Sequence, residues 1–236
     1  MLGRLESMSI RAILLDVDGT LADSTEVILL GLRESYHNFL GHSPADDEIR
    51  GLIGRPLFDQ MNLFGLEHHP SSLSERMDFA IGRFAAHQHL AKLFVEPVEA
   101  AVKLHLAGFP VAMVTSKNRL EIEEFWTVAP MLRPIPVVTA DDATRPKPFA
   151  DPALLACQML GVDPAGAVMI GDSIYDIRCG KSAGAATIAV TYGAGRLADL
   201  DAEAPDTIFT HPTALANWLE AQQSKAHAKE KDRQPC

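Results

Sequence analysis

Short apolar runs separated by amphipathic stretches dominate the hydrophobic pattern of this chain. The first run, Ile10 to Leu15, has the length and apolar content of a buried strand and is followed by two acidic residues, Asp16 and Asp18. Because side chains of a strand alternate between its faces, Asp16 and Asp18 share one side while Val17 points away. The pattern therefore predicts two carboxylates just beyond the carboxyl end of a buried strand.

The pattern changes from strand to helix after this first run. Amphipathic stretches follow one another between glycines and prolines from Ala22 to Leu93, and no convincing strand interrupts them. We expect the first of these helices to begin at Asp23 or Ser24 and to end at Gly41. The chain thus inserts an all-helical segment, residues 22–94, directly after its first strand.

Beyond residue 94 short apolar runs alternate with amphipathic helices. The runs that predict strands are Val111–Thr115, Val137–Thr139, Ala167–Ile170, Ala186–Val190 and Thr207–Phe209. This alternation is typical of an α/β fold in which helices cover a parallel sheet. We therefore predict a doubly wound, Rossmann-like parallel-sheet core formed by residues 1–21 and 95–223, with the helical segment 22–94 as a cap.

The two ends of the chain lack the pattern of a folded element. The last predicted helix, Ala214 to Ala221, is followed by a charged stretch without large apolar residues, so we expect residues 224–236 to be disordered. Residues 1–9 are a candidate disordered leader, in which Met8 is an alternative start to Met1.

Composition and charge narrow the class of function. The chain has 236 residues, of which 47% are hydrophobic, a net charge of −10 and a pI of about 5.3. An acidic surface disfavours nucleic acid and anionic membranes as partners. No apolar run reaches the ~18 residues that span a bilayer. Three cysteines, without disulfide or metal-site spacing, predict a reduced, cytoplasmic protein, and both a monomer and a homodimer remain open.

Four polar stretches follow predicted strands and therefore lie at one edge of the predicted sheet. They are Asp16 with Asp18, Thr115 with Ser116, Lys147 between two prolines, and Asp172 with Asp176 in the run Gly-Asp-Ser-Ile-Tyr-Asp. Each has an ordinary explanation by itself: a helix cap, a solvated loop charge or an acidic helix start. Together they supply carboxylates, hydroxyls and an ammonium, which are the groups that phosphoryl transfer requires.

The chemistry of these side chains indicates which of them can bind a metal ion and which can bind phosphate. Two carboxylates as close as Asp16 and Asp18 repel each other unless a cation lies beside them, and oxygen ligands of this kind suit Mg2+. Thr115 and nearby backbone N–H groups can bind phosphoryl oxygens, and the ammonium of Lys147 can neutralise their charge. The residues by themselves do not decide which aspartate attacks phosphorus.

The order and spacing of the four stretches resemble the motifs of the haloacid dehalogenase superfamily of aspartate-nucleophile phosphohydrolases. The run Asp16–Thr20 is similar to its first motif, Thr115 to its second, Lys147 to its third and residues 171–176 to its fourth. The resemblance extends from Ile10 to about Ala221. The helical insert resembles the cap of the branch that includes phosphoglycolate phosphatase and β-phosphoglucomutase.

The resemblance implies a role for each residue. Asp16 would attack phosphorus and become an aspartyl phosphate, while Asp18 would protonate the leaving oxygen and then accept a proton from water. Mg2+ would be held by Asp16, the main-chain carbonyl of Asp18, and Asp172, with Asp176 orienting water or Lys147. The residues that the resemblance assigns to phosphate binding are Gly19, Thr115, Ser116 and Lys147.

The substrate depends on the cap, where the sequence is less informative. Arg55 can bind a carboxylate or second phosphate of the substrate, although a solvated arginine is the alternative. The resemblance implies a Mg2+-dependent phosphatase acting on a small phosphorylated metabolite such as phosphoglycolate or a sugar phosphate. A phosphomutase, a pyrophosphatase and a non-catalytic binding module remain alternatives. Asp18 disfavours a dehalogenase, because the dehalogenases of this superfamily lack the second aspartate.

Overall fold

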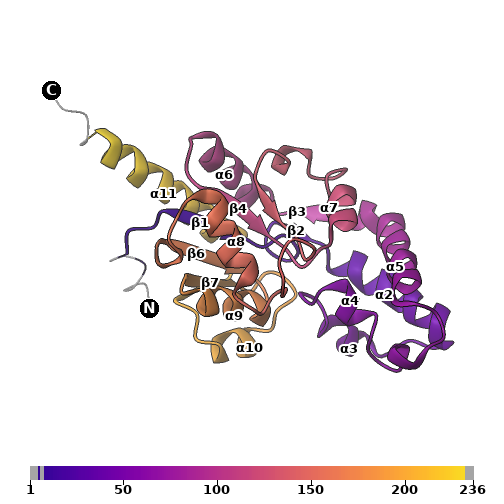
Figure 1. Ribbon diagram of the computed structural model, residues 1–236. Coiled ribbons are helices and arrows are strands. Elements are labelled where there is room, and N and C mark those ends of the chain that lie inside the picture. Colours follow the sequence, from indigo (N-terminus) through magenta and orange to yellow (C-terminus); the bar gives the residue numbers. More distant parts are fainter. Residues whose placement is uncertain (1–4, 6–7, 232–236) are drawn as a thin grey trace.

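Six parallel strands form the sheet at the centre of the molecule, in the order β5-β4-β1-β6-β7-β8 (Figure 1). This computed structural model describes Leu5 and residues 8–231, with side chains up to residue 224. The strands are β1 (Ala12–Leu15), β4 (Val111–Val114), β5 (Val137–Val138), β6 (Ala167–Gly171), β7 (Ala186–Val190) and β8 (Thr207–Phe209). The chain order reverses on either side of β1, which confirms the predicted doubly wound parallel sheet.

Helices cover both faces of the sheet, which explains why its central strands are almost entirely apolar. The covering helices are α6 (Val95–Leu106) and α11 (Pro212–Lys231) on one face and α8 (Asp151–Leu160) and α9 (Ile174–Ala183) on the other. Ile13 and Leu15 of β1 pack beneath α6 and α11, whereas Leu14 packs beneath α8 and α9. Val17 continues this alternation into the first cluster and leaves the opposite side to Asp16.

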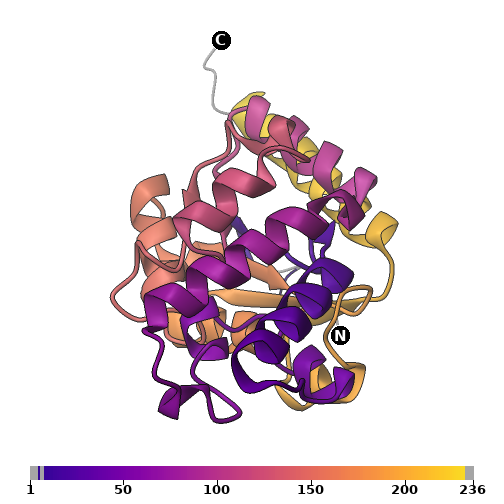
Figure 2. The same ribbon diagram turned by 90° about the vertical axis from the view of Figure 1, so that its right-hand side faces the viewer.

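The inserted segment forms a helical layer with a hydrophobic cluster of its own, over the carboxyl ends of the strands (Figure 2). Its elements are α2 (Thr25–Leu40), α3 (Asp46–Arg50), α4 (Leu57–Gln60), η1 (Leu66–His68), α5 (Leu73–His87) and η2 (Gln88–Leu90). The helix α2 follows Ser24 and ends at Gly41, whose φ of 75° is left-handed. The side chains of Leu32, Tyr36 and Met61 are completely buried in this cluster.

The connections between core and cap differ from the sequence-based expectation. The prediction of an all-helical insert is wrong at its two ends, because β2 (Ala22–Asp23) pairs antiparallel with β3 (Lys92–Leu93). The N–H of Phe94 also donates to the carbonyl of Leu21 at 2.9 Å. Two-residue strands are too short to produce a period in the sequence. The two segments that connect the core to the cap are therefore joined by hydrogen bonds.

The C-terminal helix is longer than predicted. We expected it to end at Ala221 and residues 224–236 to be disordered, but α11 continues to Lys231. Residues 222–231 contain no glycine or proline and consist mostly of Gln, Ala, Lys and Glu, whose helix propensity is high. Residues 232–236 lie outside the described residues, as do residues 1–4 and 6–7 of the candidate leader.

The remaining elements complete the connections around the core. They are α7 (Arg119–Phe125), η3 (Pro130–Leu132), η4 (Pro164–Gly166) and α10 (Leu197–Ala202). Within the described part of the chain, none of the helices combines the length and the apolar content needed to cross a membrane.

Two glycines differ in the space that surrounds them. A Cβ on Gly180 of α9 would lie 2.7 Å from Cβ of Met169 and 2.7 Å from Cγ2 of Thr187, both on the sheet. Gly82 is exposed within α5, and no atom lies within 4 Å of the place that its Cβ would take. Only the first glycine is therefore required by close packing.

Alanine substitutions at these two glycines should shift stability in opposite directions. Gly180→Ala should lower the free energy of unfolding by about 1–3 kcal/mol, because the added methyl group overpacks the contact between α9 and the sheet. Gly82→Ala should raise it by about 0.5–1 kcal/mol, because alanine restricts the unfolded chain and favours the helix. Urea denaturation measures both changes. Stabilisation by both substitutions would contradict the close approach of α9.

Candidate active site

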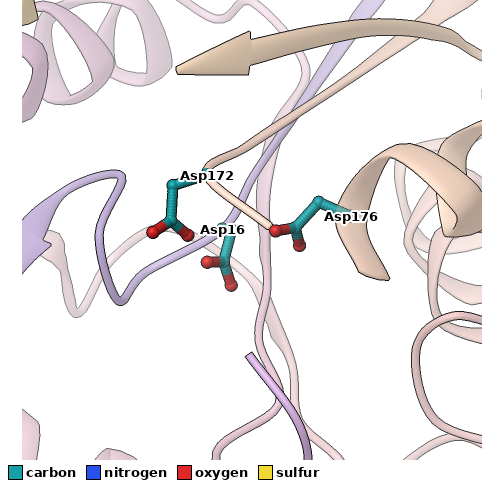
Figure 3. Close-up of side chains that lie close together, drawn as sticks. All are labelled: Asp16, Asp172 and Asp176. Carbon is teal, nitrogen blue, oxygen red and sulfur yellow. The ribbon is translucent and has the colours of Figure 1, made fainter. Parts of the chain in front are cut away.

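Three buried carboxylates meet where β1 and β6 end. Asp16 follows β1, Asp172 follows β6, and Asp176 lies in the first turn of α9. One oxygen of each lies within 4.8 Å of the others, and Figure 3 shows Asp16 between the other two. The exposed fractions are 4% for Asp16, 1% for Asp172 and 0% for Asp176. Three carboxylates so far from water cannot all stay ionised unless cations lie close by.

One of these cations is the ammonium of Lys147. Its Nζ donates to Oδ1 of Asp16 at 2.7 Å, to Oδ1 of Asp176 at 2.6 Å and to the carbonyl of Val114 at 3.2 Å. The second oxygen of Asp176 accepts from the N–H and the hydroxyl of Ser173, at 3.0 and 2.5 Å. Both oxygens of Asp176 are therefore already engaged by the protein, whereas Asp172 does not contact Lys147 in this way.

The backbone of two glycines surrounds Asp172. A Cβ on Gly19, whose φ is +75°, would lie 2.0 Å from Oδ2 of Asp172, and one on Gly193 would lie 2.4 Å from the same atom. The N–H of Ala194 donates to this oxygen at 2.7 Å. Because any larger residue would displace the carboxylate, the local sequence keeps Asp172 beside Asp16.

Asp16 and Asp172 fit a divalent cation. Burial, followed by the charge of Asp176, raises the pKa of Asp16 to about 7 despite its contact with Lys147. Burial and the charge of Asp16 also raise the pKa of Asp172 well above its usual range. Carboxylate oxygens are the ligands that Mg2+ prefers, and a dication between these two groups would remove their mutual repulsion. Asp176 is the less suitable partner, because the protein already uses its oxygens.

Asp18 pairs with a different lysine, which the sequence-based reasoning missed. Nζ of Lys117 lies 3.0 Å from Oδ2 of Asp18, and both side chains are at most 15% exposed. Burial lowers the pKa of Lys117, but the charges of Asp18 and Glu121 outweigh this effect and raise it. Oδ1 of Asp18 is buried without a hydrogen-bond partner among the described residues. Lys117 could have been found because it directly follows Thr115–Ser116 at the same strand end.

A small cavity separates the acidic centre from the cap. Its volume is about 20 Å³, and its walls include Asp16, Asp18, Arg55, Ser116 and Lys117. Such a volume holds about one water molecule. A phosphorylated ligand therefore cannot enter unless the cap moves away from the core.

The two hydroxyls that follow β4 contact protein groups in this arrangement. Oγ1 of Thr115 accepts from the N–H of Lys117 at 3.1 Å, and only 2% of Thr115 is exposed. The hydroxyl of Ser116 donates to the carbonyl of Gly54 in the cap at 2.7 Å. Thr115 and Lys147 do not line the small cavity, whereas Ser116 and Arg55 do.

The sequence-predicted residues thus occupy one region with distinct positions in it. Asp16, Lys147 and Asp176 form one hydrogen-bonded unit, and Asp172 lies beside it with Gly19. Asp18 of the core and Arg55 of the cap both border the cavity. This arrangement combines a buried nucleophile candidate, a second carboxylate at the same small cavity, and carboxylates that fit a metal ion.

Comparison with known sequences places this chain in a family. The sequence profile of the haloacid dehalogenase-like hydrolases matches residues 13–190. The chain belongs to this family, which confirms the resemblance drawn from the four strand-end motifs. The solved structure of a hydrolase from Pseudomonas syringae has the same fold, with a TM-score of 0.79 and 21% identity over 89% of this chain and 98% of that chain.

Curated relatives of higher identity carry the name PpaX. A Clostridium perfringens protein, provisionally named pyrophosphatase PpaX, is 30% identical over 213 residues, which are 89% of this chain and 98% of that protein. Pyrophosphatase PpaX of Bacillus velezensis is 29% identical over 84% of this chain and 90% of its own length. The similarity therefore spans both the core and the cap.

The raised pKa values predict how pH and Mg2+ change stability. The pKa values of Asp16 and Glu121 are raised to about 7 and that of Asp172 is also raised, each chiefly by burial, so the folded state retains protons that the unfolded state loses above about pH 4. This stabilisation is complete below about pH 4 and is lost as pH rises through about 7. Without a divalent cation, the melting temperature should fall between about pH 5 and pH 8.

Mg2+ should raise the melting temperature more at pH 8 than at pH 5.5, because it competes with those protons. Asp172→Asn should abolish the Mg2+-induced shift. Glu121→Gln is the matched control, since it should flatten the pH dependence but retain the response to Mg2+. Differential scanning calorimetry with and without EDTA measures these shifts. An equal Mg2+ response in wild type and Asp172→Asn would exclude Asp172 as a ligand.

Proposed function

We propose that this chain is a Mg2+-dependent phosphatase that hydrolyses a small phosphorylated metabolite through an aspartyl phosphate on Asp16. The observation that carries the proposal is the contact of Lys147 with Asp16, because Asp16 lines the same cavity as Asp18. Lys147 holds one oxygen of Asp16 and offsets its charge, which orients the carboxylate for attack. Mg2+, held by Asp16, the carbonyl of Asp18, and Asp172, would offset the charge of the phosphoryl group.

Asp18 has the position of a general acid and base in this reaction. Lys117 holds its Oδ2, and its Oδ1 has no partner among the described residues, so this oxygen is free to exchange a proton with substrate or water. Asp18 protonates the leaving oxygen in the first step. In the second step it accepts a proton from the water that hydrolyses the aspartyl phosphate, and the same carboxylate thus serves both half-reactions.

We assign the binding of the phosphoryl oxygens to Gly19, Thr115, Ser116 and Lys147. The position of Lys147 between two carboxylates supports its part in this set. The hydroxyl of Ser116 donates to Gly54 of the cap while the cap is closed, so it becomes available when the cap opens. Asp176 acts indirectly, because it holds Lys147 in place.

We infer that the cap, residues 22–94, opens and closes as one body over the core of residues 1–21 and 95–223. The separate hydrophobic cluster of the cap supports this division. The pairing of β2 with β3 keeps the two connecting segments side by side, so both can bend at the same place. Closure leaves a cavity of about 20 Å³. Closing over the substrate excludes all water except what hydrolysis needs.

Pyrophosphate is a second candidate substrate. The observation that favours it is the name of the relatives at 30% and 29% identity, pyrophosphatase PpaX. The side chains of Arg55 and Lys117 line the cavity, and Lys147 contacts Asp16 in its wall, so three positive charges are available for a ligand with two phosphoryl groups. A phosphomutase would share the core residues, and it would convert a sugar phosphate without releasing phosphate.

Phosphate release from a panel of phosphorylated compounds tests the proposed activity. The panel contains phosphoglycolate, sugar phosphates, nucleotides and pyrophosphate, each with Mg2+. Release should fall to background in Asp16→Asn and in EDTA, and should return in EDTA-treated enzyme when Mg2+ is restored. Activity that survives Asp16→Asn would identify a different nucleophile. If the folded, Mg2+-loaded wild type released phosphate from no compound of the panel, the proposed phosphatase activity would be contradicted.

Removal of the general acid should affect substrates according to their leaving groups. Asp18→Asn should lower kcat by about 10²–10⁴-fold for alkyl phosphates, whose leaving oxygen needs a proton. An aryl phosphate such as p-nitrophenyl phosphate has a stable leaving anion, so its first step should persist. Rapid-quench kinetics should then show one burst of nitrophenolate followed by slow turnover. Equal losses for both substrates, without a burst, would contradict the role of Asp18.

A further inference from the structure

Tyr175 occupies a position that the proposed chemistry does not use. It lies between Asp172 and Asp176, in the first turn of α9, and it is half-buried. Its hydroxyl accepts a hydrogen bond from Nε of Arg55 in the cap at 2.7 Å. Cζ of Arg55 lies 5.6 Å from the centre of the Tyr175 ring, so the guanidinium also contacts the aromatic face. This tyrosine therefore joins the metal-side loop of the core to the cap.

The backbone of Gly54, next to Arg55, packs closely against the same loop of the core. Gly54 has a φ of +94°, and a Cβ there would lie 2.9 Å from Cβ and Oγ of Ser173 and 3.1 Å from Cδ2 of Tyr175. Its carbonyl accepts from the hydroxyl of Ser116 at 2.7 Å on the other side. The cap loop is therefore held between the loops that follow β4 and β6, and only glycine allows this approach.

The Arg55–Tyr175 pair also separates two cavities. Arg55 lines the cavity of about 20 Å³ that contains Asp16 and Asp18. Tyr175 lines a second cavity of about 510 Å³, which Asp172 and Arg196 also border. Because the two side chains touch, they form part of the wall between the reaction cavity and the larger cleft.

The guanidinium of Arg55 keeps binding capacity after this contact. Tyr175 uses only Nε, and among the described residues no carboxylate forms an ion pair with Arg55. The two terminal nitrogens of a guanidinium bind carboxylates and phosphates through paired hydrogen bonds. An arginine fixed at Nε loses less conformational entropy when it binds such a group.

We propose that Tyr175 is a positioning residue that holds Arg55 over the reaction cavity, so that Arg55 selects substrates with a second anionic group. This inference rests on the proposed function, in which the first phosphoryl group is bound at Asp16. The substrate class is a phosphorylated compound with an additional carboxylate or phosphate, as in phosphoglycolate or pyrophosphate. Recognition of the second anion then depends on a contact between the core and the closed cap.

Tyr175→Phe tests the proposal, because it removes the hydroxyl and retains the ring. The KM for pyrophosphate or phosphoglycolate should rise about three- to tenfold, as expected for the loss of one hydrogen bond. The KM for p-nitrophenyl phosphate, which has no second anionic group, should not change, and kcat should stay within about twofold for all substrates. In an Arg55→Met background, Tyr175→Phe should cause no further rise, because the two substitutions remove the same interaction.

Hydrogen exchange gives a second readout that does not need activity. Amides of residues 51–55 in Tyr175→Phe should exchange about three- to tenfold faster than those of wild type, because the cap loop loses an anchor. Tyr192→Phe is the matched control, since its hydroxyl donates to the carbonyl of Thr20 at 3.0 Å and does not contact the cap loop. It should change neither the exchange of residues 51–55 nor the ratio of the two KM values.

Several results would overturn the proposal. Identical exchange in Tyr175→Phe and Tyr192→Phe would show that Tyr175 does not anchor the cap loop. Equal increases in KM for pyrophosphate and p-nitrophenyl phosphate would show a general structural role without selection by Arg55. If the wild type hydrolysed none of these substrates, the proposed phosphatase activity would be contradicted instead. The exchange measurement would still decide whether Tyr175 holds the cap.

Discussion

The ammonium of Lys147 is the contact on which the acidic centre depends. It lies within hydrogen-bond distance of Asp16 and Asp176, and only 1% of its side chain is exposed. Removing one partner of a buried ion pair costs about 3–5 kcal/mol, because the remaining charges stay in a poorly solvated place. Without Lys147, the folded protein would have to protonate the carboxylates or admit water. The lysine thus lowers the pKa of Asp16 against the effect of burial, in a site from which bulk water is excluded.

The sheet topology brings this lysine and its partners together. Adjacent parallel strands β1 and β6 place Asp16 and Asp172 at one edge, and α9 then positions Asp176 one turn further on. The loop before α8 brings Lys147 to the same edge from the far side of β4. Because the cap is inserted immediately after β1, its loop at Gly54–Arg55 can reach the segments that follow both β4 and β6. Core and cap thus meet where the charged groups need protection from water.

Sequence reasoning succeeded where a local pattern carries the information. Continuous apolar runs mark the buried strands, and polar residues directly after them mark the edge where the site forms. The pairing of β2 with β3 was missed because two residues produce no period, and the extension of α11 follows from helix propensity without an apolar stripe. The contact of Arg55 with Tyr175 spans 120 positions, so no local pattern can reveal it. Lys117 was overlooked although it directly follows Thr115–Ser116 at the same strand end.

The two aspartates of the first motif are only two positions apart, yet the fold gives them different surroundings. Asp16 faces Lys147 and the carboxylates of Asp172 and Asp176, where a metal ion and a fixed ammonium both suit a nucleophile. Asp18 pairs with Lys117 and keeps one oxygen without a partner among the described residues, as its proposed role of acid and base requires. From the residues alone either aspartate could attack. Lys147 pairs with Asp16, whereas Lys117 pairs with Asp18. This difference supports the proposal that Asp16 is the nucleophile and Asp18 the proton carrier.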